Sequence, residues 1–403
     1  MTPELKSIAA RIGEFISRAS GMGVSPVSSL QSTAETEFNT LALDLFALQL
    51  ANNAPYRRIS EARGVEPRSV EHWMQIPAVP AAAFKELELT CLAPAERTTV
   101  FHSSGTTEQR PSRHFHCAES LALYEASLWP WFQRHVLAGL AICQSRLAIL
   151  APSPISAPNS SLVHMFEIIR RQSGAGEASC LGGVSADGAW TLDYPRTEAA
   201  IQVAIDTGQP LVLLGTAFNF VHLLDDFAVR NLRFELPPGS VVMETGGYKG
   251  RSRELPKAEL HALITRRLGV PSSQIICEYG MSELSSQAYD SGASRNTQHA
   301  TRRFHFPPWA RVQIISPETG REVADGGTGL VRIFDLANAF SVLAVQTEDL
   351  AIRRGSGFEL IGRAVAAETR GCSLMASFGV PPLGGSGQEP PKGGTPNPAA
   401  RKT

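Results

Sequence analysis

The sequence has little lysine and no long hydrophobic run. Six of its 37 basic residues are lysines, and they stand far apart, at Lys6, Lys85, Lys249, Lys257, Lys392 and Lys402. The 38 acidic residues nearly balance the basic ones, so the overall charge offers no field that would attract nucleic acid or an anionic membrane. No stretch approaches the ~18 apolar residues of a membrane-spanning helix, and the first residues show no targeting pattern. We therefore expect a cytoplasmic protein with no nucleic-acid partner and no membrane span.

The cysteines are widely separated, with no CxxC pair and no spacing typical of metal ligands. They are Cys91, Cys117, Cys143, Cys180, Cys277 and Cys372. This absence argues against disulfides and a structural zinc, so most of the cysteines are expected to be small buried residues. The chain has 403 residues, of which 43% are apolar, and is long enough for one large hydrophobic core or two unequal ones.

Short apolar runs alternate with amphipathic stretches in the middle of the chain. The runs are RLAILAP (146–152), PLVLLGT (210–216), SVVMETGG (240–247) and QIICEYG (274–280). Segments 217–227 and 256–268, which separate the later runs, have a helical period. Apolar strands that alternate with helices indicate an α/β fold, in which a largely parallel sheet is covered on both faces. Ligands of such sheets bind where the strands end.

Composition divides the chain into four regions. Residues 1–90 are expected to be helical, because segment 38–52 has apolar side chains at three- and four-residue steps. The α/β core is predicted over residues 91–310. A β-rich subdomain with a short C-terminal extension is predicted over residues 311–378, where shorter strands and glycine turns occur. Residues 379–403 contain six glycines and six prolines, which predicts a disordered tail.

A hydroxyl-rich loop is the first candidate binding element. It consists of Ser103, Ser104, Gly105, Thr106 and Thr107. The hydroxyl groups, with backbone N–H groups that the glycine allows to turn inward, can hold a polyphosphate. The loop lacks the GxxxxGK[ST] spacing of a Walker loop, and an ordinary Ser/Thr-rich turn is the alternative.

The second candidate element, EYGMSE, directly follows the apolar run that ends at 277. Gly280 permits a tight turn at the end of a strand, and the ring of Tyr279 can lie against a base. Glu283 can present its carboxylate to a phosphate-bound Mg²⁺. The alternative is a plain strand-to-helix turn with Ser282 as its cap. The two elements together are more specific than either one alone.

The order of the motifs resembles the acyl-adenylate-forming superfamily of acyl-CoA synthetases, luciferases and peptide synthetase adenylation domains. The motifs are SSGTT (103–107), YGMSE (279–283), TEDL (347–350) and IGR (361–363). This resemblance implies the large-domain fold of those enzymes, with mixed and parallel sheets flanked by helices and a small β-rich subdomain. It also implies ATP and Mg²⁺ as cofactors.

The resemblance further implies roles for individual residues. The nucleotide-binding residues would be Ser103, Ser104, Gly105, Thr106, Thr107, Gly246, Gly247, Tyr248, Tyr279, Gly280, Ser282, Asp349 and Arg363. Glu283 would be the metal ligand, and Asp349 would accept hydrogen bonds from the ribose hydroxyls. Arg363 would lie nearby and act in catalysis together with Glu283. An acidic residue after a strand, or a Gly-Arg pair, is also common in ordinary turns.

A narrower resemblance covers about residues 38–374. The helical N-terminal region, IPAVPAAAFK, ETGGYKGRSREL and GRAVAAETRGCSL are similar to acyl-protein synthetases of the LuxE type. The resemblance implies a ligase that activates a carboxylic, typically fatty, acid as an acyl-adenylate and forms a thioester on a cysteine near the C-terminus, here Cys372. Arg370 could stabilise the thiolate of Cys372; an inert, partly buried cysteine is the alternative. An acyl-CoA or fatty acid reductase, or an acyl carrier, is the implied partner.

Two departures from the superfamily pattern keep other functions open. Glu108 follows the hydroxyl loop near the place where most members have a lysine, and no lysine occurs between Lys257 and Lys392. We therefore expect the C-terminal lid domain, with its catalytic lysine, to be reduced or absent. The alternatives are a phenylacetate-type acyl-CoA ligase and a non-catalytic acyl- or nucleotide-binding subunit of a reductase complex. His164, in a helical apolar segment, is the candidate substrate-binding residue, with a structural histidine as the alternative.

Overall fold

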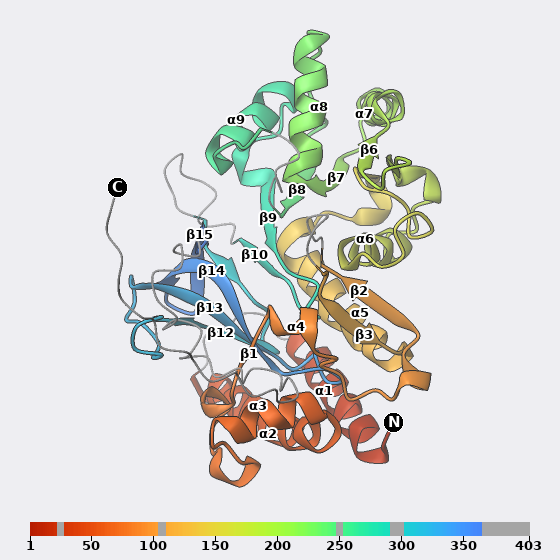
Figure 1. Ribbon diagram of the computed structural model, residues 1–403. Helices are drawn as coiled ribbons and strands as arrows, with labels where there is room; N and C mark the ends of the chain where they lie inside the picture. The colour runs from red at the N-terminus through yellow and green to blue at the C-terminus, as the bar shows by residue number, and fades with distance from the viewer. Residues whose placement is uncertain (22–27, 104–109, 247–252, 291–301, 365–403) are drawn as a thin grey trace, which may run out of the picture.

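The computed structural model describes residues 1–21, 28–103, 110–246, 253–290 and 302–364. Its main feature is a mixed eleven-stranded sheet in the order β12-β13-β14-β15-β11-β10-β9-β8-β7-β4, with β1 beside β14 (Figure 1). The parallel half comprises β4 (Arg146–Ile149), β7 (Leu211–Thr216), β8 (Val241–Thr245) and β9 (Ile275–Tyr279). These four strands coincide with the four apolar runs, and the predicted α/β fold class is confirmed.

The other half of the sheet is mainly antiparallel and begins where β10 returns alongside β9. Its strands are β10 (Ala288–Asp290), β11 (Phe304–His305), β12 (Ala310–Ile315), β13 (Thr328–Asp335), β14 (Ala344–Arg354), β15 (Gly357–Arg363) and β1 (Val79–Pro80). Two hairpins stand apart from this sheet. They are β2 (Thr99–His102) with β3 (Arg113–His116), and β5 (Gly182–Val184) with β6 (Trp190–Leu192). The β-rich part of the chain therefore extends the parallel sheet edge to edge.

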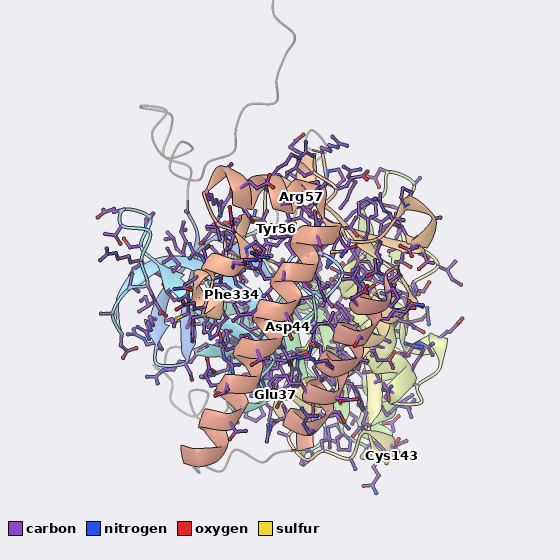
Figure 2. The ribbon with its side chains drawn as sticks, turned by 90° about the horizontal axis from the view of Figure 1, so that it is seen from below. Glu37, Asp44, Tyr56, Arg57, Cys143 and Phe334 are labelled. Carbon is purple, nitrogen blue, oxygen red and sulfur yellow. The ribbon has the colours of Figure 1, made fainter. Side chains whose placement is uncertain are left out.

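Helices cover the sheet and build the N-terminal part of the molecule. They are α1 (Pro3–Gly21), α2 (Ser28–Asn52), α3 (Ala54–Ala62), α4 (Ala83–Glu86), α5 (Ala118–Phe132), α6 (Ser161–Gln172), α7 (Tyr194–Thr207), α8 (Ala217–Val229) and α9 (Lys257–Leu268). Figure 1 shows α8 and α9 beside β7–β9, and α1–α3 at the opposite end of the molecule. In Figure 2, α1 and α2 lie side by side, joined by the ion pairs Arg11–Asp44 and Arg18–Glu37.

Two unequal hydrophobic cores stabilise this arrangement. The larger core runs from Leu5 in α1 to Phe358 in β15 and joins the N-terminal helices to the sheet. The smaller core lies between the parallel strands and α7–α9, with Phe220 and Leu260 among its fully buried side chains. Burial of this kind removes apolar surface from water and fixes the ends of β8 and β9 next to each other. Among the described residues, no helix is long and apolar enough to cross a membrane.

Candidate active site

The base of the hydroxyl-rich loop is held by two serines. In the β2–β3 hairpin His102 pairs with Arg113, so Ser103 and Ser112 stand where the loop leaves and re-enters the hairpin. The Ser103 N–H donates to the Ser112 carbonyl at 3.3 Å, and the Ser112 N–H donates to Ser103 Oγ at 2.9 Å. The two hydroxyl oxygens are also 2.9 Å apart. The loop therefore starts from a closed, hydrogen-bonded base.

Glu283 lies against this base. Its carboxylate accepts a hydrogen bond from the Ser112 hydroxyl and, at 3.1 Å, another from the Ser282 hydroxyl. Only 4% of Glu283 is exposed, and burial raises the pKa of its carboxyl although the two hydroxyl groups and the charge of Arg363 oppose that rise. The carboxylate is thus bordered by oxygen atoms of the loop base, 171 positions away in sequence.

Buried hydrogen bonds hold the turn that carries Glu283. The Asp335 carboxylate, at the end of β13, accepts hydrogen bonds from the N–H groups of Ser285 and Ser286 at 3.0 and 2.8 Å. On the other side of the turn, His114 Nδ1 lies 2.9 Å from the Ser282 carbonyl oxygen. Burial lowers the pKa of His114 to about 4, so its imidazole is neutral and donates this bond. The turn is therefore fixed from both sides.

A second carboxylate approaches from the antiparallel half of the sheet. The Tyr279 hydroxyl donates to Asp349 Oδ2 at 2.8 Å, and Arg363 Nε lies 3.5 Å from Asp349 Oδ1. Asp349 and Arg363 face each other in the β14–β15 register. The Arg363 side chain is 82% exposed, and its charge acts on both Glu283 and Tyr279. It is therefore a cation held at the edge of the site that can still turn toward a ligand.

The ends of β8 and β9 form the floor between these groups. Thr245 pairs with Glu278 in the sheet, and the Thr245 hydroxyl donates to the Glu278 carboxyl. A Cβ atom at Gly280 would lie 2.3 Å from Glu278 Oε1, so a larger residue at this turn would require that carboxyl group to shift. Gly246, with φ of 72°, ends β8 in the left-handed region that favours glycine.

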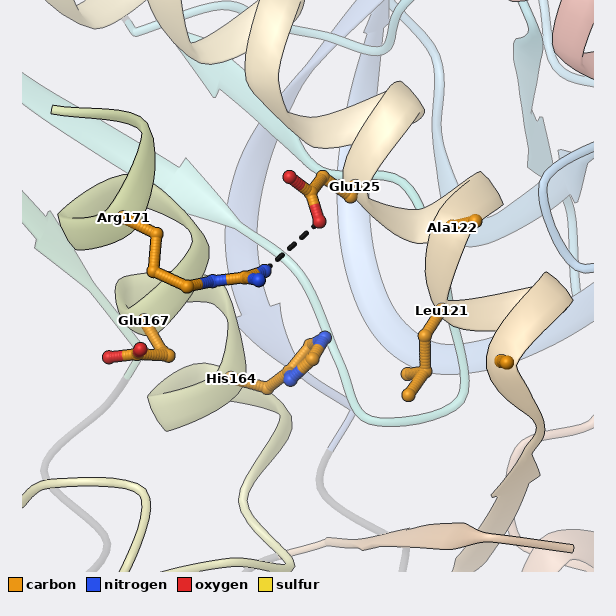
Figure 3. Close-up of a pocket in the computed structure, with 7 residues that line it drawn as sticks. Leu121, Ala122, Glu125, His164, Glu167 and Arg171 are labelled. Carbon is orange, nitrogen blue, oxygen red and sulfur yellow. Dashed lines mark hydrogen bonds and ion pairs between the residues drawn. The ribbon is translucent and has the colours of Figure 1, made fainter. Parts of the chain in front are cut away.

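His164 lies on α6, beside a cavity of about 420 Å³ between α5 and α6 (Figure 3). The cavity is lined by Ala118, Leu121, Ala122, Glu125, His164, Glu167 and Arg171. The His164 ring centroid is 5.1 Å from that of Phe101, which is two residues before Ser103. Burial lowers the pKa of His164 to about 4, and its Nε2 has no hydrogen-bond partner among the described residues. A neutral imidazole with one unused nitrogen thus stands between the loop base and the cavity.

The described part of the predicted site is clustered in space. It comprises Ser103, Gly246, Tyr279, Gly280, Ser282, Glu283, Asp349 and Arg363, and the predicted substrate-binding residue His164 is also described. The predicted residues that lie outside the described ranges are Ser104, Gly105, Thr106, Thr107, Gly247, Tyr248 and Cys372. The sequence reasoning missed Ser112 and His114, which connect the loop base to the YGMSE turn. Neither belongs to a motif, and their only sequence signal is a position just after the hydroxyl loop. The roles of all these residues remain predictions.

Comparison with known proteins shows which family part of the chain is similar to. The family model "Acyl-protein synthetase, LuxE" matches residues 184–379. Two curated relatives, each named long-chain-fatty-acid–luciferin-component ligase, are 23% identical to the chain. The Vibrio harveyi relative matches over 81% of this chain and 83% of its own length. The match to the Aliivibrio fischeri relative covers 45% of this chain and about half (49%) of that protein's length.

The fold of this chain is that of adenylate-forming ligases. A crystal structure of 2-hydroxyisobutyryl-CoA ligase, in complex with 2-HIB-AMP and CoA, superposes with a TM-score of 0.58 at 14% identity. The similarity covers 81% of this chain and 70% of the ligase. The predicted resemblance and the predicted adenylate-forming fold are both confirmed.

Proposed function

We propose that this chain uses ATP to convert a carboxylic acid into an acyl-adenylate and then transfers the acyl group to a thiol. One observation carries the proposal. Glu283, joined through Ser112 to the base of the hydroxyl-rich loop, faces the same site as Asp349 and Arg363. A loop for phosphates, a buried carboxylate, a carboxylate for a sugar and an exposed cation are the groups that nucleotide activation needs. The names of both curated relatives make long-chain fatty acids the first acids to test.

The environment of Glu283 fits a magnesium ion. Its carboxylate is nearly buried, and the groups around it are the hydroxyl oxygens of Ser112 and Ser282. Mg²⁺ prefers such oxygen ligands and shares them with nucleotide phosphates. Glu283 would hold the ion, with Ser112 positioning the carboxylate. A bound ion would supply positive charge to the phosphate oxygens.

Three further side chains would position the rest of the nucleotide. One carboxylate oxygen of Asp349 accepts a hydrogen bond from Tyr279, and the other lies near Arg363. Both oxygens can accept additional hydrogen bonds from ribose hydroxyls. The Tyr279 ring would border the adenine together with the strand end at Gly246. Arg363 is exposed enough to turn from Asp349 to the phosphate that receives the acid.

The acid would bind on the side of the site that carries His164. Its carboxylate oxygen would attack the α-phosphorus of ATP, and the bond from that phosphorus to pyrophosphate would break. The unused nitrogen of the neutral His164 imidazole can donate a hydrogen bond to the acid near the loop base. In the second step a thiol sulfur would attack the acyl carbon, AMP would leave and the thiol proton would pass to solvent. Cys372, outside the described residues, is the proposed acceptor.

The first half-reaction is tested by pyrophosphate release across fatty acids of increasing chain length. Glu283→Gln should lower the rate about a hundredfold or more, which corresponds to about 3 kcal/mol of lost transition-state stabilisation. Glu259→Gln, at an exposed position on α9, is the matched control and should keep the wild-type rate. Circular dichroism would check that both variants are folded. ATP binding without pyrophosphate release, for every acid tested, would instead identify a non-catalytic nucleotide-binding subunit.

The second half-reaction is tested with a labelled fatty acid. The wild-type chain should acquire label that hydroxylamine removes, as a thioester requires. Cys372→Ser should lose that label but still release pyrophosphate, whereas Cys143→Ser, which removes an exposed cysteine, should be labelled normally. Efficient transfer to free CoA by the Cys372→Ser variant would contradict the cysteine acceptor and favour a CoA ligase.

A further inference from the structure

Three metal-ligating side chains of different types meet beneath the end of β8. Glu244 of β8 and Cys277 of β9 are paired in the sheet, and His261 reaches them from α9. Cys277 Sγ lies 2.9 Å from Glu244 Oε1, His261 Nε2 lies 3.2 Å from the same oxygen, and the sulfur and the nitrogen are 3.7 Å apart. All three residues are buried. They come from three different elements and none of them belongs to the candidate active site.

The spacing of these atoms matches one face of a metal tetrahedron. Zinc–oxygen and zinc–nitrogen bonds are about 2.0–2.2 Å and zinc–sulfur bonds about 2.3 Å, which separates neighbouring ligand atoms by roughly 3.3–3.6 Å. The nitrogen–oxygen and nitrogen–sulfur separations, 3.2 and 3.7 Å, lie next to that range, and the sulfur–oxygen separation of 2.9 Å would widen when a metal binds. A thiolate, an imidazole and a carboxylate together favour zinc over magnesium or calcium, which prefer oxygen ligands.

Lys257 already supplies a cation to the carboxylate that a metal ion would bind. Its Nζ lies 2.6 and 2.5 Å from the two oxygens of Glu244, whose side chain is fully buried. The Lys257 side chain is 43% exposed, so its ammonium group can withdraw to solvent by rotation of its own stem. The carboxylate cannot follow, because β8 is buried between its neighbours. A metal ion that binds here would therefore replace the Lys257 ammonium group beside the buried Glu244 carboxylate.

We propose that Glu244, His261 and Cys277 form a binding site for a divalent ion of the zinc class, which exchanges with the ammonium group of Lys257. On binding, the contact between Lys257 and Glu244 breaks, a metal–sulfur bond forms and the Cys277 S–H bond breaks. The thiol proton passes to solvent. The buried charge stays balanced, since one ammonium against one carboxylate is replaced by a divalent ion against a carboxylate and a thiolate.

The position of the site connects it to the floor of the nucleotide site. Lys257 Nζ also lies 3.5 Å from the carbonyl oxygen of Gly246, the glycine that ends β8. Withdrawal of Lys257 would remove that contact, and the bound ion would hold β8, β9 and α9 together in its place. The ion would thus act structurally, at a place separate from Glu283.

The test is a Co²⁺ titration of the metal-free chain, because tetrahedral cobalt–thiolate sites absorb in the near ultraviolet and the visible. A Cys143→Ser background removes an exposed thiol that could bind cobalt non-specifically. We expect one equivalent of cobalt with a thiolate-to-metal band, which zinc abolishes. Cys277→Ser should lose the band, whereas Cys180→Ser, which removes another buried cysteine, should keep it. No band in the wild type, or an unchanged band in Cys277→Ser, would overturn the proposal.

A second variant tests the exchange with Lys257 and guards against misfolding of the cysteine variant. Lys257→Met removes the competing ammonium group and keeps the three ligands. It should bind cobalt at least tenfold more tightly than the wild type, and added zinc should raise its melting temperature more than that of the wild type. If Lys257→Met binds cobalt equally or more weakly than the wild type, the metal does not exchange with the Lys257 ammonium group. Since the readout is metal binding, the result does not depend on whether the chain forms an acyl-adenylate.

Discussion

Replacement of Glu278 by glutamine should make the stability of this protein less dependent on pH. Burial raises the pKa of the Glu278 carboxyl to about 7 from the ordinary value of 4.5, with the charge of Glu244 adding to the effect and Thr245 and Lys257 opposing it. At about 1.4 kcal/mol per pKa unit, this difference corresponds to about 3 kcal/mol. The folded protein therefore carries a carboxylic acid that resists ionisation.

The sign of the effect follows from the direction of the shift. Because the folded pKa lies above the unfolded one, the stabilising contribution is complete below pH 4.5 and is lost as the pH rises through about 7. Glutamine has nearly the same shape as the protonated acid and does not ionise. Glu278→Gln should thus match the wild type in acid and exceed its free energy of unfolding by about 3 kcal/mol above neutral pH.

Urea unfolding across this pH range measures the difference directly. The free energies of unfolding of wild type and Glu278→Gln should diverge between pH 4.5 and about 7. Glu259→Gln, on the exposed face of α9, is the control and should follow the wild-type curve throughout. If the Glu278→Gln and wild-type curves stay parallel over the whole range, the buried carboxyl does not have a raised pKa and the reasoning fails.

Two further substitutions test the site and the sheet. Tyr279→Phe removes the hydroxyl that donates to Asp349 at 2.8 Å. The KM for ATP in pyrophosphate release should therefore rise about fivefold, the equivalent of about 1 kcal/mol. An unchanged KM would show that Asp349 does not bind the nucleotide. Gly329→Ala would place a Cβ atom 2.4 Å from the carbonyl oxygen of Ile315, which should cost about 1–3 kcal/mol of stability in urea unfolding. Gly176→Ala, which meets nothing within 4 Å, is the control, and equal losses in the two variants would contradict the steric argument.

Local patterns predicted most of the parallel half and missed part of the antiparallel half. The runs at 210–216 and 240–247 became β7 and β8 because strands covered on both faces are apolar throughout. Strand β14 was covered only by the general prediction of a β-rich region, because its buried polar side chains Gln346 and Thr347 interrupt the apolar pattern. Both are satisfied across the sheet: Arg332 Nε donates to Gln346 at 2.9 Å, and the Thr347 hydroxyl donates to the Val331 carbonyl at 2.9 Å.

The sequence by itself determined the resemblance to acyl-protein synthetases, the α/β fold and the motifs around Ser103, Glu283 and Arg363, because each rests on neighbouring residues or on a local period. Only the tertiary structure showed that Ser112 joins the loop base to Glu283. It also revealed the Glu244, His261 and Cys277 cluster, although the spacing of the cysteines had argued against a structural zinc. The physical reason is the same in both cases. Sheet register and helix packing bring together side chains that are far apart along the chain, and no local pattern records which ones will meet.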